Sequence, residues 1–315
     1  MTALSSDHAP ASIAPDTAAT AANSTPGSGT APAQPPTAAE IVARAVAADG
    51  RRAAPPVVIE RLRFADPWRW LALGVRDARA APGVAAFYGS CFWIMALVLG
   101  WVFRTRPEYT MSIASGCLLV GPFLAMGLYD TSRRREAGLK PSLGESLTCW
   151  DTHMGSMGML VLVLVVLELL WGRASLVVFA VFFNTGMPST TGVLDAVFSP
   201  SNWTFVAVYA GVGGVFAALV FSTSVVSIPM ILDRDTDALT AGITSIRVVL
   251  ENTLVMLQWG ALLTLIVAAS LWLWGIGLLV AGPVLGHASW HAYRASVRPA
   301  GAAGSATGTA AGEAA

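Results

Sequence analysis

Long apolar stretches are the feature that most constrains the fold of this chain. About 20 mainly apolar residues are needed to cross the ~30 Å hydrocarbon core of a bilayer. Such stretches begin near Val84, Thr110, Met154 and Trp203, and a still longer one runs from Thr253 to Trp290. Charged residues make up only 12% of the chain, about half the share found in soluble domains. The sequence therefore predicts an all-α protein that crosses a membrane several times.

Two of these stretches are too long for one simple span. As a single helix, Thr253 to Trp290 would measure about 57 Å, so we predict two short spans joined by a turn near Trp272–Gly275. This division brings the total to six transmembrane helices. The third span is harder to bound, because apolar residues continue from Met154 to Phe183. Gly172-Arg173 is a candidate break, and the alternative is one long helix that tilts or projects from the membrane.

The two ends of the chain differ from this apolar core. Residues 1–55 and 299–315 are rich in small and polar residues and contain no apolar segment that could order them. We therefore predict a disordered cytoplasmic tail at each end and a six-span helical membrane domain over residues 56–298.

The distribution of arginine predicts the orientation. Seven arginines lie between Arg51 and Arg79, before the first span, and further basic residues follow the second, fourth and sixth spans. The opposite side has Arg104, Arg106 and Arg173. Loops rich in Lys and Arg stay in the cytoplasm, so both termini are predicted to lie inside. The same residues predict contact with anionic lipid at the cytoplasmic face, and we expect no nucleic-acid partner.

A gapless internal similarity links two of the predicted spans. Gly116–Arg133 and Gly277–Arg294 align at an offset of 161 residues and share a Gly-Pro-x-Leu core. A polar or amphipathic stretch also precedes each odd-numbered span, at Asp66–Ala81, Ser142–His153 and Ala238–Asn252. These features suggest three repeated helical hairpins with amphipathic cytoplasmic lead-ins. Chance recurrence of Leu, Gly and Pro in membrane helices explains them equally well.

Three prolines fall in the even-numbered spans. Proline removes one backbone donor and bends a helix, so we predict helix kinks at Pro122, Pro229 and Pro283. Gly282 and Gly286 have the G-x-x-x-G spacing that allows close helix packing. We expect that packing within one bundle rather than between two copies.

The first lead-in is predicted to be an interfacial helix. Asp66-Pro67 is a favourable helix start. The apolar face would comprise Trp68, Leu71, Val75 and Ala78, and the positions pointing elsewhere would be Arg69, Arg76 and Asp77. Such a helix would lie on the cytoplasmic leaflet with its tryptophan side in the membrane.

Histidine provides the best candidate for a chemical site. His287 and His291 are four residues apart and share a helix face, and His153 starts the third span on the same side of the membrane. Three imidazoles at one depth could bind zinc, copper or a haem iron. An amphipathic ring is also stable at the membrane interface without any ligand, which is the simpler explanation. The three residues are therefore metal-ligand candidates, and no cofactor is predicted.

Glu168 and Arg173 are the second candidate, because ionisable groups inside a bilayer are costly and often functional. A proton relay or an ion path would use them. However, five residues separate them by about 140° around a helix. Snorkelling to the membrane surface, or pairing with another helix, is the explanation we favour.

Three stretches resemble a known family. They are Gly121–Glu136, which ends in Leu-Tyr-Asp-Thr-Ser-Arg-Arg-Arg-Glu, Pro229–Ala238, which contains Leu-Asp-Arg-Asp, and Gly286–Arg294, which contains His-Ala-Ser-Trp-His. Together they resemble the bacterial integral-membrane family catalogued as domain of unknown function 2189. Asp130 stands where that family's pattern has Glu. The resemblance implies a polytopic bacterial inner-membrane protein with no established activity.

Some members of that family are labelled as a cytochrome c oxidase subunit. A catalytic haem–copper subunit holds two haems and a copper with imidazole ligands. This chain has four histidines, of which His8 lies in the predicted tail, so it has too few for that role. An accessory or assembly role linked to a respiratory oxidase stays open.

The sequence contains no Walker loop, nucleophile elbow or zinc-protease motif, and we predict no catalytic site. The leading hypothesis is a structural, accessory or assembly-type inner-membrane protein with a membrane-protein partner. One alternative is a small-solute transporter or channel that uses the three proline-containing helices. The other is a metal- or haem-binding accessory protein.

Overall fold

The computed structural model describes residues 57–106, 109–183, 202–272 and 274–300. Apart from residues 299 and 300, both predicted tails lie outside the described part of the chain. In chain order the elements are β1 (Val57–Ile59), α2 (Asp66–Ala80), α3 (Pro82–Thr105), α4 (Thr110–Glu136), α5 (Leu143–Thr148), a 3-10 turn (Asp151–His153), α6 (Met154–Phe182), α8 (Trp203–Ser224), α9 (Ser227–Arg234), α10 (Ala238–Glu251), α11 (Thr253–Trp272), α12 (Leu278–Ser296) and β2 (Val297–Pro299).

Four helical segments of the described chain are long and apolar enough to cross a membrane. They are Pro82–Thr105, Leu143–Phe182, Trp203–Arg234 and Thr253–Trp272. The helices α4 and α12 are not among them, and both carry charged or polar side chains in their last third. The all-α prediction for the membrane part is therefore confirmed, whereas the count of six spans is not.

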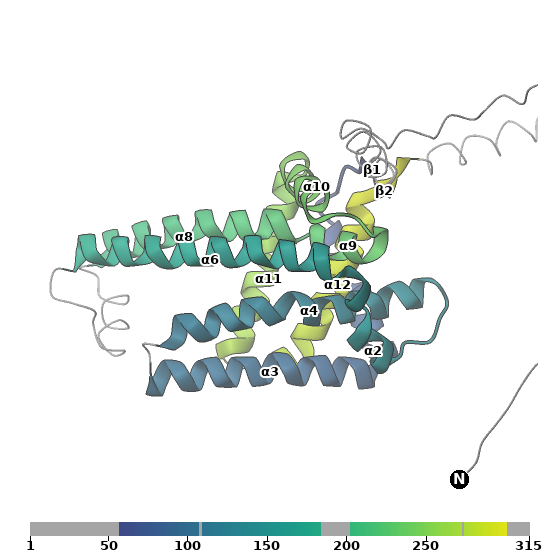
Figure 1. Cartoon of the computed structure of the whole chain (residues 1–315), viewed down its shortest axis with the longest axis horizontal. Helices are drawn as coiled ribbons and strands as arrows, with labels where there is room; N and C mark the ends of the chain where they lie inside the picture. Colours follow the sequence, from purple (N-terminus) through teal and green to yellow (C-terminus); the bar gives the residue numbers. More distant parts are fainter. Residues whose placement is uncertain (1–56, 107–108, 184–201, 273, 301–315) are drawn as a thin grey trace, which may run out of the picture. The chain divides into compact units, whose positions relative to one another are not determined.

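The third span is one continuous helix, so the break considered at Gly172-Arg173 is wrong. The helix α6 runs through both residues from Met154 to Phe182, a length of about 43 Å. It lies beside α8 for most of that length (Figure 1). Leu and Val dominate the sequence around the glycine, and a single glycine costs a helix only about 1 kcal/mol.

The fourth predicted span is divided, which corrects the prediction of a kink at Pro229. The helix α8 ends at Ser224 and the separate helix α9 begins at Ser227. Pro229 therefore lies in the first turn of α9, where its missing N–H group removes no helical hydrogen bond. Pro122 and Pro283 do lie inside α4 and α12. The turn predicted between the fifth and sixth spans is present between α11 and α12, with φ of 72° at Gly275.

The two short strands are a feature that the sequence analysis missed. They pair antiparallel, with Val57 opposite Pro299 and Ile59 opposite Val297. The Asn252 side chain reinforces this clasp, because its Oδ1 accepts the Leu62 N–H at 2.8 Å and its Nδ2 donates to the carbonyl of Glu60 at 3.1 Å. Three-residue strands are too short to leave a periodic pattern in the sequence.

The lead-in helix α2 packs through a different face from the predicted one. Trp68 is 59% exposed, whereas Trp70 is 3% exposed and makes an edge-to-face contact with Trp259 at 5.5 Å between ring centroids. Gly74 lies so close to α12 that an added Cβ would be 2.4 Å from the carbonyl oxygen of Val284. The same face carries Asp77, which is 2% exposed.

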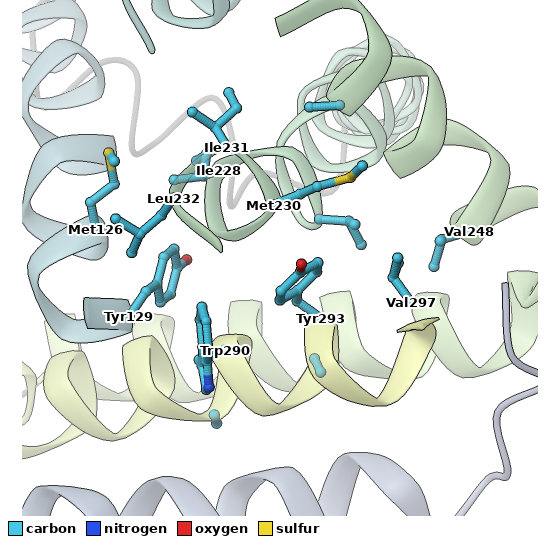
Figure 2. Packing of buried hydrophobic residues seen from close by; sticks show 14 of the residues in the cluster. Met126, Tyr129, Ile228, Met230, Ile231, Leu232, Val248, Trp290, Tyr293 and Val297 are labelled. Atoms are coloured by element: carbon cyan, nitrogen blue, oxygen red, sulfur yellow. The ribbon is translucent and has the colours of Figure 1, made fainter. Parts of the chain in front are cut away.

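The main hydrophobic core lies where α4, α9 and α12 meet. Figure 2 shows Tyr129, Leu232, Trp290 and Tyr293 pointing into this region from the three helices. Elsewhere the long helices expose large apolar side chains, such as Leu254 at 71%. This distribution is the one expected when lipid, rather than water, surrounds the spans.

Gly89 provides a test of the close contact between α3 and α12. An added Cβ there would be 2.2 Å from the carbonyl oxygen of Leu279, whereas at Gly100 of the same helix nothing lies within 4 Å. Gly89→Ala should lower the free energy of unfolding by ~1–3 kcal/mol through overpacking. Gly100→Ala should be neutral or stabilising. Equal effects of the two variants on thermal unfolding in detergent would contradict this packing.

Candidate functional site

A buried carboxylate joins three helices at one end of the bundle. The Oδ2 atom of Asp77 accepts hydrogen bonds from Ser132 Oγ at 2.7 Å and from His291 Nε2 at 2.9 Å. Its Oδ1 atom is paired with the Arg135 guanidinium. Ser132 Oγ also lies 2.8 Å from His287 Nδ1. We call these five residues, from α2, α4 and α12, the Asp77 cluster.

Helix periodicity explains why these side chains converge. Ser132 and Arg135 are three residues apart on α4, and His287 and His291 are four apart on α12, so each pair shares one helix face. The close approach of α2 to α12 brings Asp77 between them. The result is a polar cluster with little access to water, since Ser132 and His287 are fully buried and His291 is 8% exposed.

The hydrogen-bond donors of the cluster follow from the ionised state of Asp77. Burial raises the pKa of the Asp77 carboxyl, but the hydrogen bonds from His291 and Ser132 and the charges of His291 and Arg135 outweigh it, so the pKa is lowered. A carboxylate only accepts, so the Ser132 hydroxyl donates to Asp77. The Ser132 oxygen then accepts from His287, which assigns the proton of His287 to Nδ1.

A second buried carboxylate, that of Asp130, lies on α4 two residues before Ser132. Asp130 is fully buried and accepts from Arg133 at 2.6 Å and from Arg134 at 2.7 Å. Arg133 also donates to the carbonyl of Leu232 at 2.9 Å, and Arg134 is 2.7 Å from Glu145. Asp130 therefore positions two arginines that tie α4 to α9 and to α5.

A third set of contacts ties α9 to α12. The Tyr293 hydroxyl donates to Asp233 at 2.6 Å and accepts from Arg234 Nε at 2.8 Å. Arg294 is 3.4 Å from Asp233 and 3.2 Å from Glu136 of α4. These three sets of contacts lie at the same end of the helices, which we call the charged end.

Only part of this site was predictable from the sequence. His287 and His291 were candidates and belong to the cluster, but Asp77 was expected to point away from the packed face. Arg133, Arg134 and Arg135 were predicted only to set the orientation and to contact anionic lipid. One signal could have identified the polar residues of α4, α9 and α12, but not Asp77: the three stretches that resemble a known family contain nearly all of them, and the fold brings those stretches together.

His153 does not join the other two histidines. Its ring lies 3.2 Å from the carbonyl of Cys149 and 3.7 Å from Asp235. Within the described residues, no set of three His, Cys, Asp or Glu side chains is arranged to hold a metal ion. The metal site remains a hypothesis for which the fold supplies at most the pair His287 and His291.

Glu168 and Arg173 point to different surroundings. Glu168 lines a cavity of about 300 Å³ between α6 and α8, together with Trp171 and Gly213. Arg173 is exposed, and the two described side chains form no ion pair with each other.

Comparison with known proteins agrees with the resemblance noted above. Residues 109–233 match the model of DUF2189, a family described as a predicted integral membrane protein. This segment covers α4 to most of α9. It includes Asp130, Ser132 and the arginines of α4 but not Asp77 or the histidines of α12. No curated protein and no solved structure matches the chain. Over this segment the chain is similar to a family of predicted integral membrane proteins.

Asp77→Asn should destabilise the protein at neutral pH and much less in acid. Because the pKa of Asp77 is lowered in the folded protein, its charge stabilises the fold above the unfolded pKa of ~3.9. That contribution is lost as the pH falls through the folded pKa. The free energies of unfolding of wild type and variant should differ by on the order of 3 kcal/mol at pH 7, and this difference should shrink as the pH falls toward the folded pKa.

Unfolding in detergent from pH 7 to pH 3 measures this difference. Asp151→Asn, at an exposed position, is the matched control and should have no effect above ~0.5 kcal/mol. A gap between wild type and Asp77→Asn that stays constant with pH would contradict the assignment of the charge to Asp77.

Proposed function

We propose that the protein is a non-catalytic, accessory or assembly-type inner-membrane protein that presents its charged end as a fixed platform. The observation that carries this proposal is the Asp77 cluster, because its reactive groups are used to hold helices together. Ser132 and His291 both donate to Asp77, and both are buried. A serine and a histidine arranged for catalysis would instead face a cavity that a substrate can enter.

The pairing of the long helices and the position of the arginines support a six-span topology with both termini in the cytoplasm. The helix pairs α3–α4, α6–α8 and α11–α12 each lie side by side (Figure 1). The arginines of α2 and of the end of α4 belong to the charged end, where the positive-inside rule places the cytoplasm. Under this proposal α4 and α12 also cross the membrane, with their polar last thirds at its inner surface.

The element order supports the idea of three repeated hairpins. A shorter helix precedes each pair of long helices: α2 before α3, α5 before α6, and α10 before α11. These helices fall where the three amphipathic lead-ins were predicted. The repeat would also explain why Arg133 and Arg294 both contact α9, since the two arginines are equivalent in the alignment.

The two alternatives have less support. A metal or haem would have to displace hydrogen bonds already made by His287 Nδ1 and His291 Nε2, so these residues do not fit such a group well. A transporter or channel would use the proline-containing helices α4 and α12. In the described structure their polar ends pack closely against α2 and α9 rather than lining a passage.

Single cysteines labelled with a membrane-impermeant maleimide test the topology, in a background in which the three native cysteines are replaced. In spheroplasts, Tyr109→Cys and Trp272→Cys should react, because both side chains are exposed at the proposed outer side. Ala137→Cys and Glu251→Cys should react only after permeabilisation. Labelling of Tyr109→Cys and Ala137→Cys from the same side would contradict a transmembrane α4 and the six-span proposal.

Site-specific photo-crosslinking in native membranes tests the accessory role. At the charged end, Leu139 and Leu147 are 57% and 39% exposed, whereas Leu232 of α9 is buried. A photo-reactive residue at either exposed leucine should give one discrete, high-yield adduct with another membrane protein, and a residue at Leu232 should give none. Adducts with lipid alone, together with solute flux in liposomes made from the purified protein, would overturn the proposal in favour of a transporter.

A further inference from the structure

Two neighbouring cavities form a continuous groove along α3, which runs from the connection between α3 and α4 to Tyr129 and Gly286 near the Asp77 cluster. One cavity of about 450 Å³ lies among α3, α4, α11 and α12. The other, of about 630 Å³, continues toward the connection between α3 and α4. Ala96, Leu99 and Leu271 line both. We call this combined space the α3 groove.

The α3 groove is apolar along most of its length and cationic at one end. Phe92 and Met95 line its inner part, whereas Arg104 and Thr110 line its outer part. The Arg104 guanidinium stacks on the Trp274 ring at 4.1 Å. Stacking leaves its N–H donors directed outward from the ring edge, and no hydrogen bond or ion pair of Arg104 is found among the described residues.

An unsatisfied polar atom lies at the same end. Thr110 Oγ1 is buried and has no hydrogen-bond partner in the described structure. A buried hydroxyl without a partner costs ~1–3 kcal/mol, so such a group is typically satisfied by something bound. Arg104 and Thr110 together offer donors that match an oxyanion such as a phosphate diester.

The part of the α3 groove between Arg104 and Phe92 is about as long as one leaflet of a bilayer. Phe92 and Arg104 are twelve residues apart on α3, which corresponds to about 18 Å along the helix. Half of the hydrocarbon core is ~15 Å. Gly121 of α4 lines the inner part, and an added Cβ there would meet nothing within 4 Å, so the space beside it is open.

We propose that the α3 groove binds one anionic phospholipid. Its phosphate lies at Arg104 and Thr110, and one acyl chain runs between α3 and α11 toward Phe92 and Gly121. General contact with lipid requires only an apolar surface. A cation and an unpartnered hydroxyl at the end of an apolar cavity select a lipid by charge as well as by shape.

Native mass spectrometry of the delipidated full-length protein in detergent tests this, with phosphatidylglycerol and phosphatidylcholine as probes. Wild type should retain one phosphatidylglycerol per chain at a concentration about ten-fold below that needed for phosphatidylcholine. Arg104→Gln should abolish this preference, and Arg104→Lys should keep most of it because the charge remains. Gly121→Leu should weaken retention of both lipids by filling the groove.

Matched controls separate this site from general effects of charge and bulk. Arg173→Gln removes another exposed arginine, and Gly214→Leu adds a side chain at another glycine where an added Cβ would meet nothing within 4 Å; both should behave as wild type. Thermal unfolding without lipid checks that each variant is folded. If Arg104→Gln does not fold, Arg104→Lys and Gly121→Leu still decide the result. Equal retention of the two lipids by wild type, or equal effects of Gly121→Leu and Gly214→Leu, would overturn the proposal.

Discussion

The buried carboxylate of Asp77 is the constraint on which the arrangement of the helices depends. An ionised carboxylate with only 2% exposure is tolerable only when donors surround it, since removing a charge from water costs several kcal/mol. Those donors come from Ser132 and Arg135 of α4 and from His291 of α12. The position of α2 is thereby fixed against two other helices at once, and Gly74 permits the close contact that this requires.

The membrane domain has two parts that are held together by different interactions. At the charged end, carboxylates and arginines connect five helices, and the β1–β2 clasp adds the two ends of the described chain. Away from that end, the spans contact one another through apolar side chains, where lipid competes with protein for the same surface. The proposed accessory role rests on this contrast between a fixed platform and a more loosely packed set of spans.

Apolar length predicted most of the helices, because hydrophobic stretches of this size have few other structures available. Boundaries were less predictable: composition favoured a break at Gly172-Arg173 that α6 does not have, and it did not reveal the break before α9. The site was harder still. An amphipathic pattern places Trp68 on the buried face of α2, since tryptophan is apolar and Asp77 is charged. In the fold, Asp77 lies on the buried face and Trp68 is exposed, because α4 and α12 supply donors to the carboxylate. These helices are distant in the sequence, so no local pattern in α2 could have shown the donors.

A double-mutant cycle between Asp77 and His291 tests the central claim most directly. The free energies of unfolding of wild type, Asp77→Asn, His291→Gln and the double variant are measured at pH 7 in the same detergent. If the buried carboxylate and the imidazole hold α2 and α12 together, the sum of the destabilisations in the two single variants should exceed the destabilisation in the double variant by ~1–3 kcal/mol. Effects that add to within ~0.5 kcal/mol would show that the two side chains do not act on each other, and the account given for this fold would be wrong.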